Sequence, residues 1–324
     1  MYIGWVHYYT PKVFSFLSFL INPLFVYLVF TDKKANMGKY RYLLTYFATF
    51  NIFYSTLDIL VPAAFHDYRY CFFFFVSDGL FAEANDFNHV FLLLRCSMVS
   101  CSYAVLITHF AYRYLIIHQD SFVKTHFVSF VIASFLLAMF YYTSWAYILH
   151  TFMTVTPEMR DYIQESFYKE HGESSQTINA VSLIFNEVPE YNVIRSWTCV
   201  ALMTTLPSLS IAFYIYIGYQ IMKELGRVGH QMSPKTKEMQ KNLFNALVLQ
   251  TAIPIVVSYT PCIVAMLAPT MKIELGRTMN YSGVIALALF PFFDPLAIIL
   301  CLPVLRNRVV PKSWTKTSQV SASA

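Results

Sequence analysis

The sequence predicts an all-α fold, a bundle of seven helices that cross a lipid bilayer. Of its 324 residues, 57% are apolar and only 13% are charged, whereas about a quarter of the residues in a soluble domain are charged. Seven apolar stretches are long enough to span a bilayer, which takes roughly 20 helical residues at about 1.5 Å each. The predicted spans are residues 13–30, 42–64, 88–112, 126–149, 196–222, 243–268 and 280–302.

Charged side chains are almost absent from these spans. The seven spans together contain three Asp, Glu, Lys or Arg residues, namely Asp58, Arg95 and Asp294. The first span is the shortest and contains Asn22-Pro23, but its length still suffices to cross the hydrocarbon. Because no internal repeat or second domain is visible, we expect residues 1–324 to form one transmembrane domain.

The basic residues predict the orientation of the bundle. Fifteen Lys and Arg residues fall on one side of the predicted spans and seven on the other, where the connecting segments are longer. Since Lys and Arg accumulate in cytoplasmic loops, the N-terminus is expected outside and the tail, 303–324, in the cytoplasm. The same rule accounts for the net charge of +5, so nothing in the charge calls for a nucleic-acid partner.

One segment outside the spans has the composition of a soluble structure, the outer loop at 150–195. Thr156-Pro157-Glu158 has the pattern of a helix start: an N-cap, a proline at the first position and an acid at the positive helix end. Apolar residues then recur at helical spacing as far as Phe167, and Gly172 can end the helix. We therefore expect a short amphipathic helix over the mouth of the bundle.

Three polar residues lie at one predicted depth in the membrane. Asn22, Asn51 and Asp294 are each eight or nine residues from the inner boundary of their span, which is roughly 12–14 Å. Together with Pro295 they are predicted to form a hydrogen-bonded network that joins the first, second and seventh helices. The alternative is that each side chain is satisfied locally, with Asn22 capping the distortion at Pro23.

Asp58 and Arg95 are predicted to lie in the outer third of neighbouring helices. A buried ion pair would keep either charge from standing alone, which is the costly state in hydrocarbon. The alternative is that Arg95 faces an outer cavity and meets an anionic ligand. The two interpretations are compatible with each other.

Prolines and cysteines allow further expectations. Pro207, Pro254 and Pro261, like Pro295, each remove a backbone donor and can act as helix hinges or as packing devices. Among the cysteines, Cys71 is in an outer loop and Cys199 is near the outer end of the fifth span, so a disulfide between them is one interpretation.

Signatures of catalysis are absent from the sequence. It contains no His-Glu-x-x-His motif, no phosphate-binding glycine loop and no paired aspartates in a protease-like setting. The histidines are scattered, and His109 is expected to be packed rather than metal-bound. We expect no enzyme activity, no cofactor and no metal site.

Two motifs give the chain a resemblance to rhodopsin-like G-protein-coupled receptors. Tyr112-Arg113-Tyr114 ends the third span where those receptors have an acid-Arg-Tyr motif, and Asp294-Pro295 resembles their Asn-Pro-x-x-Tyr motif. Here Tyr112 replaces the acid and Ile298 replaces the final tyrosine. The resemblance implies that Arg113 faces a G protein, but this sequence lacks the acid of the lock on Arg113 and the tyrosine of the switch in the seventh span.

Longer segments resemble the nematode serpentine chemoreceptors of the Str superfamily, most closely the Srj family. The resemblance extends from about Phe16 to Arg308. The segments that carry it are Ser18-Phe19-Leu20-Ile21-Asn22-Pro23, Met37-Gly38-Lys39-Tyr40-Arg41-Tyr42, Phe110-Ala111-Tyr112-Arg113-Tyr114, Gln250-Thr251-Ala252-Ile253-Pro254 and Asp294-Pro295-Leu296-Ala297.

The resemblance implies an olfactory-type receptor in the plasma membrane, on the cilium of a sensory neuron. A small-molecule odorant would bind between the outer halves of the helices and shift an equilibrium between inactive and active states. A heterotrimeric G protein would then dock on the inner ends of helices. The residues implied in coupling are Tyr112, Arg113, Tyr114, Lys223, Lys237 and Lys241, although cytoplasmic location alone explains the lysines.

Two other classes of membrane protein compete with the receptor interpretation. A seven-helix ligand-gated channel subunit would have the inverted orientation, which the distribution of basic residues opposes. A small transporter would be expected to show repeats, broken helices and more charge at the membrane midplane, and none of these is evident.

Overall fold

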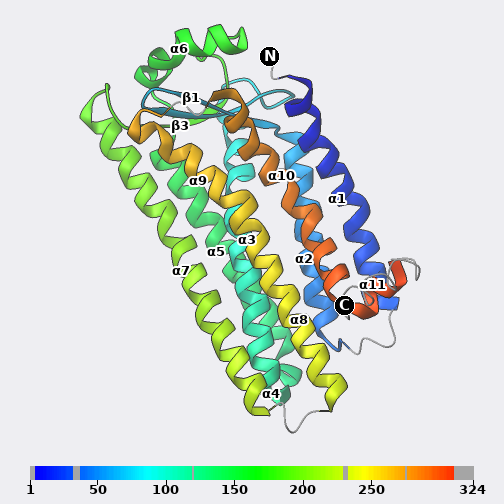
Figure 1. The fold of residues 1–324 in the computed structure, drawn as a ribbon. Helices are drawn as coiled ribbons and strands as arrows, with labels where there is room; N and C mark the ends of the chain where they lie inside the picture. The colour runs from blue at the N-terminus through cyan, green and yellow to red at the C-terminus, as the bar shows by residue number, and fades with distance from the viewer. Residues whose placement is uncertain (1–3, 32–36, 119, 229–232, 274–275, 310–324) are drawn as a thin grey trace, which may run out of the picture.

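The computed structural model describes residues 4–31, 37–118, 120–228, 233–273 and 276–309. Within these ranges, seven helical segments are long and apolar enough to cross a membrane, and they pack side by side as a bundle (Figure 1). They are α1 (Trp5–Thr31), α2 (Tyr40–Leu60), α3 (Asp86–His118), α5 (Phe127–Phe152), α7 (Glu190–Val228), the continuous run α8–η1–α9 (Pro234–Leu267) and α10 (Gly276–Cys301). Four short helices complete the helical part: α4 (Asp120–Thr125), α6 (Pro157–His171), η2 (Ala268–Met271) and α11 (Pro303–Val309).

The helix boundaries differ from the predicted spans mainly at the ends. Helix α1 begins at Trp5, eight residues before the expected start at residue 13, and α7 extends over 39 residues. Helix α2 ends at Leu60 rather than at residue 64. The cause is Pro62, because the residue before a proline is pushed out of the helical region, and Val61 has φ −126° and ψ 69°.

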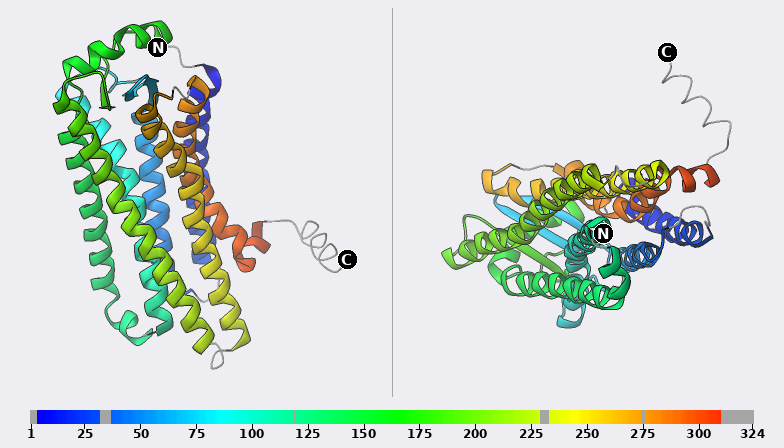
Figure 2. Two further views of the ribbon diagram at one scale, coloured as in Figure 1. Left: turned by 60° about the vertical axis from the view of Figure 1, so that its left-hand side comes forward. Right: turned by 90° about the horizontal axis from the view of Figure 1, so that it is seen from below.

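A three-stranded antiparallel sheet lies at the end of the bundle where α1 begins, here called the outer end (Figure 2). Its strands are β1 (Ala63–Tyr68), β2 (Cys71–Val76) and β3 (Ala180–Ile184), in the order β1-β2-β3. All six residues of β2 are buried, because one face of the sheet covers the bundle and the other lies under α6. Neither the apolar spans nor the motifs of the sequence predict this sheet.

Helix α6 covers the sheet from outside and coincides with the short helix expected in the outer loop. Pro157 is at its first turn, and Gly172 ends it in the left-handed conformation, φ +73°, which a residue without Cβ adopts at little cost. Its apolar side chains Met159, Ile163 and Phe167 are buried against the sheet. Sheet and α6 together form a cap over the outer end of the bundle.

The cysteines are free throughout the described chain. Cys71 packs with the residues between the sheet and α6, whereas Cys199 packs with those between the sheet and the bundle. Because the two thiols face opposite sides of the sheet, the interpretation of a Cys71–Cys199 disulfide is wrong for this structure. Cys71 Sγ instead lies 3.3 Å from Ser182 Oγ.

Candidate functional site

A cavity of about 350 Å³ lies beneath the sheet, in the outer half of the bundle. Its walls come from α3, α5, α7, the η1–α9 run and α10, and its roof comes from the sheet. The roof residues Phe65, Phe72, Phe74 and Val181 are on alternate positions of their strands, so they share the face that looks toward the bundle. The roof therefore depends on the strands that the sequence analysis missed.

One roof residue is placed by a glycine. A Cβ added to Gly283 of α10 would lie 2.7 Å from Cε2 of Phe65, which is closer than carbon atoms approach one another without displacement. The absence of a side chain at Gly283 thus lets the Phe65 ring pack against α10 while it lines the cavity.

Arg95 is the charged residue of the cavity wall. Its guanidinium forms a buried ion pair with Asp58 of α2, and Nη1 donates a 3.2 Å hydrogen bond to the hydroxyl of Tyr54. Among the described residues, Nε of Arg95 has no hydrogen-bond partner. The geometry thus accommodates both interpretations of Arg95 at once, since it pairs with Asp58 and also borders the cavity.

The α8–η1–α9 run changes its helical geometry where it lines the cavity. Residues Pro254–Tyr259 form a π-helix, η1, between the α-helices α8 and α9. Tyr259 at its end hydrogen-bonds through its hydroxyl to Ser102 Oγ of α3, and its ring stacks on Tyr103 with centroids 4.6 Å apart. π-Helical turns are rare and occur often at functional positions. The predicted hinge Pro254 is the first residue of this turn, and Pro261 follows two residues after its end. Nothing in the sequence singled out Tyr259.

Pro207 of α7 also borders the cavity, with Thr204 and Ser208 beside it. Because proline has no N–H, the carbonyl of Met203 lacks its helical donor. The third predicted hinge thus lies in the cavity wall. It also leaves one backbone acceptor next to the cavity-lining hydroxyls of α7.

A tether joins the N-terminal helix to the cap. The hydroxyl of Tyr8 donates a 2.7 Å hydrogen bond to Asp78, which follows β2, and Lys12 Nζ lies 3.7 Å from the same carboxylate. The hydrogen bond from Tyr8 is the main reason why the pKa of Asp78 is held below its ordinary value.

A second carboxyl group of the cap, Asp67 in β1, has a raised pKa. Burial raises the pKa of Asp67 to about 8, and the negative charge of Glu170 adds to the effect.

The predicted polar network is present in part. Asn51 Nδ2 donates to Asn22 Oδ1 at 3.2 Å, and Asn22 Nδ2 donates to the backbone oxygens of Ser18 and Pro291 at 2.9 and 3.0 Å. Helices α1, α2 and α10 are therefore joined at one level. Oδ1 of Asp294 has no hydrogen-bond partner among the described residues, so this oxygen does not take the expected part in the network.

Pro295 explains why a backbone carbonyl replaces the carboxylate in this network. A helical N–H donates to the carbonyl four residues before it, and a proline at 295 cannot donate to Pro291. The free carbonyl of Pro291 instead accepts from Asn22 Nδ2 and, at 3.4 Å, from Ser18 Oγ.

At the opposite, inner end of the bundle, Arg113 is buried and joined to two other helices. Its Nη1 donates a 3.1 Å hydrogen bond to Oε1 of Gln240 on α8, and its guanidinium lies 3.8 Å from the ring centroid of Tyr40 on α2. The ring of Tyr112 stacks on the same Tyr40 ring, with the two ring centroids 5.3 Å apart. No pattern in the sequence singles out Gln240 or Tyr40 as a partner of Arg113, so these two contacts were not predicted.

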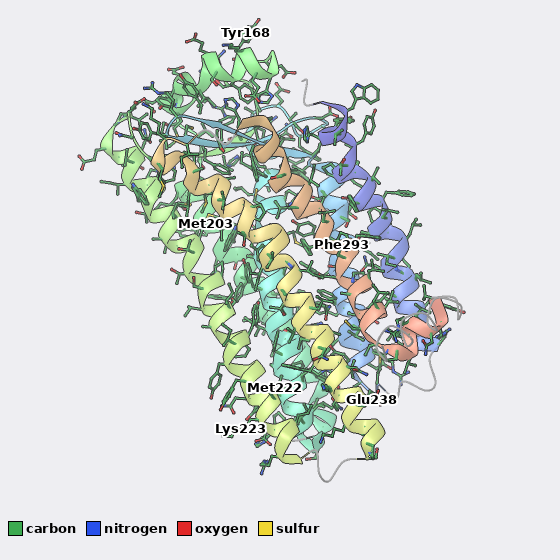
Figure 3. The ribbon with its side chains drawn as sticks, in the orientation of Figure 1. Tyr168, Met203, Met222, Lys223, Glu238 and Phe293 are labelled. Carbon is green, nitrogen blue, oxygen red and sulfur yellow. The ribbon has the colours of Figure 1, made fainter. Side chains whose placement is uncertain are left out.

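The remaining residues predicted for the inner face are peripheral to Arg113. Tyr114 stacks on His118 with ring centroids 5.5 Å apart. Lys223 is exposed near the inner end of α7 (Figure 3), and Lys237 and Lys241 are exposed on α8. Lys237 and Lys241 are thus on the same helix as Gln240, and Lys223 is on another helix, α7.

A seven-helix bundle with a capped cavity in its outer half and a buried arginine at its inner end is the architecture of a seven-transmembrane receptor. Residues 1–309 match the family described as "Serpentine type 7TM GPCR chemoreceptor Srj", and the chain belongs to this family. The predicted fold class is thereby confirmed, and the protein is a multi-pass membrane protein.

Similar proteins extend over nearly the whole chain. Serpentine receptor class J-38 of Caenorhabditis elegans is 37% identical over 317 residues, which cover 98% of this chain and 96% of that protein. Serpentine receptor class r-10 of the same organism is 25% identical over 312 residues, covering 95% and 91%. G-protein coupled receptor str-33 is 21% identical, covering 92% and 87%. These relatives are receptors and not enzymes.

Proposed function

We propose that the protein is a chemosensory receptor of the plasma membrane that binds a small organic odorant in the cavity and activates a heterotrimeric G protein. The observation that carries the proposal is the cavity itself. A volume of about 350 Å³ is at the lower end of the range for small-molecule sites, and such sites are mostly apolar with a few polar groups. The family description as a chemoreceptor supports the same function.

The polar groups of the cavity favour ligands that accept hydrogen bonds. Arg95 Nε is a donor, and the charge of the guanidinium is already balanced by Asp58. A neutral acceptor such as a ketone or ester oxygen therefore suits the site, and a free carboxylate would compete with Asp58. The aromatic roof residues Phe65, Phe72 and Phe74 provide the apolar contact area.

The cavity and the inner face share one helix, which gives ligand binding a route to the G protein. Tyr259 of η1 borders the cavity, and Gln240 of α8, on the same helical run, holds Arg113. A ligand that favours another packing of Tyr259 against α3 would shift α8 and weaken the Gln240 contact. Only a difference in affinity between the two states can drive such a shift. Arg113, Tyr112 and the exposed lysines would then form the docking face.

The family description, more than the geometry, supports the proposed localisation. Seven spans require a membrane, and detection of an external odorant requires that the cavity open to the outside of the plasma membrane. The ciliary membrane of a sensory neuron is the expected place for a chemosensory receptor of this kind. The N-terminus would then lie outside the cell and the lysine-rich inner face in the cytoplasm.

The test uses two matched substitutions on one helix. Met203 lines the cavity and Met222 is exposed toward the inner end of the same helix α7 (Figure 3). The receptor is expressed in cultured cells with a promiscuous Gα subunit and is screened against volatile ketones, esters, alcohols and hydrocarbons. We expect Met203→Phe to weaken responses because the bulkier and stiffer ring narrows the cavity, while Met222→Phe leaves them intact at equal surface expression.

Two results would contradict the proposal. A response that Met203→Phe leaves unchanged would place the ligand elsewhere. An odorant-evoked membrane current that persists when G-protein activation is blocked would favour a channel.

A further inference from the structure

Three side chains with metal-ligating atoms meet between β1 and the C-terminal end of α6. They are His66, Glu170 and His171, and one ligand atom of each lies within 4.8 Å of the others. His66 Nδ1 is 3.3 Å from Glu170 Oε2, and the two imidazole ring centroids are 5.2 Å apart. None of these residues borders the odorant cavity, which lies on the other side of the sheet.

The two imidazoles are held by packing. His66 and His171 are 1% and 3% exposed, and the Phe167 ring contacts both, at centroid distances of 5.4 and 4.7 Å. The side chain of Glu170 is 29% exposed. The imidazoles thus form a preorganised inner part of the cluster, while the carboxylate at its rim leaves a path to solvent.

Ser166 selects the ring atom with which His66 faces the cluster. Its Oγ lies 3.2 Å from Nε2 of His66, so Nδ1 is the nitrogen directed toward Glu170. Histidines that bind metal usually hydrogen-bond through their other ring nitrogen, which fixes the tautomer and the orientation of the ring. The cluster therefore has an outer partner as well as three potential ligands.

The position of the carboxylate also favours a cation. Glu170 is in the last turn of α6, one residue before the final helical residue His171. A negative charge is unfavourable at the C-terminal end of a helix, where the helix dipole is itself negative. A bound cation would offset this repulsion.

We propose that His66, Glu170 and His171 bind a divalent transition-metal ion of the zinc class. Two imidazoles and one carboxylate, with a fourth position left to water, are a ligand set that zinc accepts. With metal–ligand distances of roughly 2.1 Å, ligand atoms in tetrahedral geometry lie about 3.4 Å apart. The pair His66–Glu170 already has this separation, and the ligand atom of His171, within 4.8 Å of both, would reach it by a rotation of the side chain.

The ion would fasten the cap. His66 is on β1 and the other two ligands are on α6, so the metal would cross-link strand and helix. Phe65, the residue next to His66, is on the opposite face of the strand and lines the cavity roof. Metal binding would therefore stiffen the roof, but the site itself requires neither the odorant nor the G protein of the proposed function.

The experiment is a metal titration of the full-length receptor, purified with a histidine-free affinity tag and reconstituted in lipid nanodiscs. Zinc is titrated in competition with a chromogenic chelator. We expect one tight equivalent per chain, and a loss of affinity of more than about tenfold in His66→Ala, His171→Gln and Glu170→Gln. His150→Ala, at the outer end of α5, and Glu158→Gln, on the same helix α6, are the matched controls and should bind as the wild type does.

A second measurement on the wild-type protein covers variants that do not fold. Copper(II) replaces zinc, and the electron paramagnetic resonance spectrum is expected to show coupling to two imidazole nitrogens. The proposal is overturned if the wild type takes up no tight equivalent of zinc, if the folded His66→Ala and His171→Gln variants retain its affinity, or if the copper spectrum lacks nitrogen coupling.

Discussion

Arg113 Nη1 donates a 3.1 Å hydrogen bond to Oε1 of Gln240, which joins the inner end of α3 to the inner part of α8. In this chain Tyr112 precedes the arginine where related receptor classes have an acid, and Tyr40 lies under the guanidinium. The amide and the tyrosine ring thus hold the buried arginine instead of a neighbouring carboxylate. If this contact stabilises the inactive state, removing it should raise activity without any ligand.

Gln240→Ala is expected to increase basal G-protein signalling. A hydrogen bond to a charged group contributes about 1.5 kcal/mol or more, so its loss should shift the equilibrium between states by roughly tenfold. The measurement is ligand-free signalling normalised to surface expression, with Glu238→Ala, at an exposed position of the same helix, as control. Basal signalling at or below the wild-type level would show that the contact does not hold the inactive state.

Asp58→Arg is expected to reduce the amount of folded receptor at the cell surface. The change places two cations side by side at a buried position, and breaking a buried ion pair costs about 3–5 kcal/mol. The double variant Asp58→Arg/Arg95→Asp restores opposite charges and should recover part of the surface expression. Surface labelling of an extracellular tag measures both, and a double variant no better than Asp58→Arg alone would argue against the pair as a structural element.

Gly283→Ala is expected to weaken odorant responses while the receptor still reaches the surface. The added methyl group would overlap the Phe65 ring, and the ring can move only by leaving its place in the cavity roof. Gly218→Ala on α7 is the control, because its Cβ would meet Phe110 Cε1 at an ordinary 3.6 Å. Adding Phe65→Leu to Gly283→Ala should restore response size, since the smaller side chain removes the overlap.

The hydropathy pattern was sufficient for the bundle because a helix in lipid must satisfy its own backbone and therefore needs about 20 apolar residues in succession. Helix α6 was likewise predictable, since Pro157 and Gly172 mark its two ends locally. The sheet was not predictable in the same way. The run of phenylalanines in β2 has no alternation when both faces are buried, and its partner β3 is more than 100 residues away.

The contacts between polar residues inside the bundle were predictable only where two residues lie at the same depth in the membrane. Depth along the helices correctly brought Asn22 to the level of Asn51, and Asp58 to that of Arg95. It does not give the direction in which a side chain leaves its helix, and so Asp294 was assigned to a network that the Pro291 carbonyl completes. The cluster of His66 with Glu170 and His171 was missed for a related reason, because only the packing of α6 on β1 brings these residues together.

The hydrogen bond from Asn22 to the Pro291 carbonyl gives a prediction about Pro295. Asn22→Ala should lower the thermal stability of the detergent-solubilised receptor, because the Pro291 carbonyl keeps only the long 3.4 Å hydrogen bond from Ser18 Oγ. A fully unsatisfied buried carbonyl costs about 1–3 kcal/mol, which sets the upper limit of the loss. Pro295→Ala supplies the missing backbone N–H four residues after Pro291, so the loss caused by Asn22→Ala should be smaller in the Pro295→Ala background.

The matched control for this cycle is Pro207→Ala, which supplies an N–H to the carbonyl of Met203 on α7, away from Asn22. Melting temperatures of the four receptors in each cycle are compared. Asn22→Ala and Pro207→Ala should act additively, whereas Asn22→Ala and Pro295→Ala should not. If both cycles are additive, the Pro291 carbonyl is satisfied by some other donor, and the link between α1 and α10 does not depend on the proline.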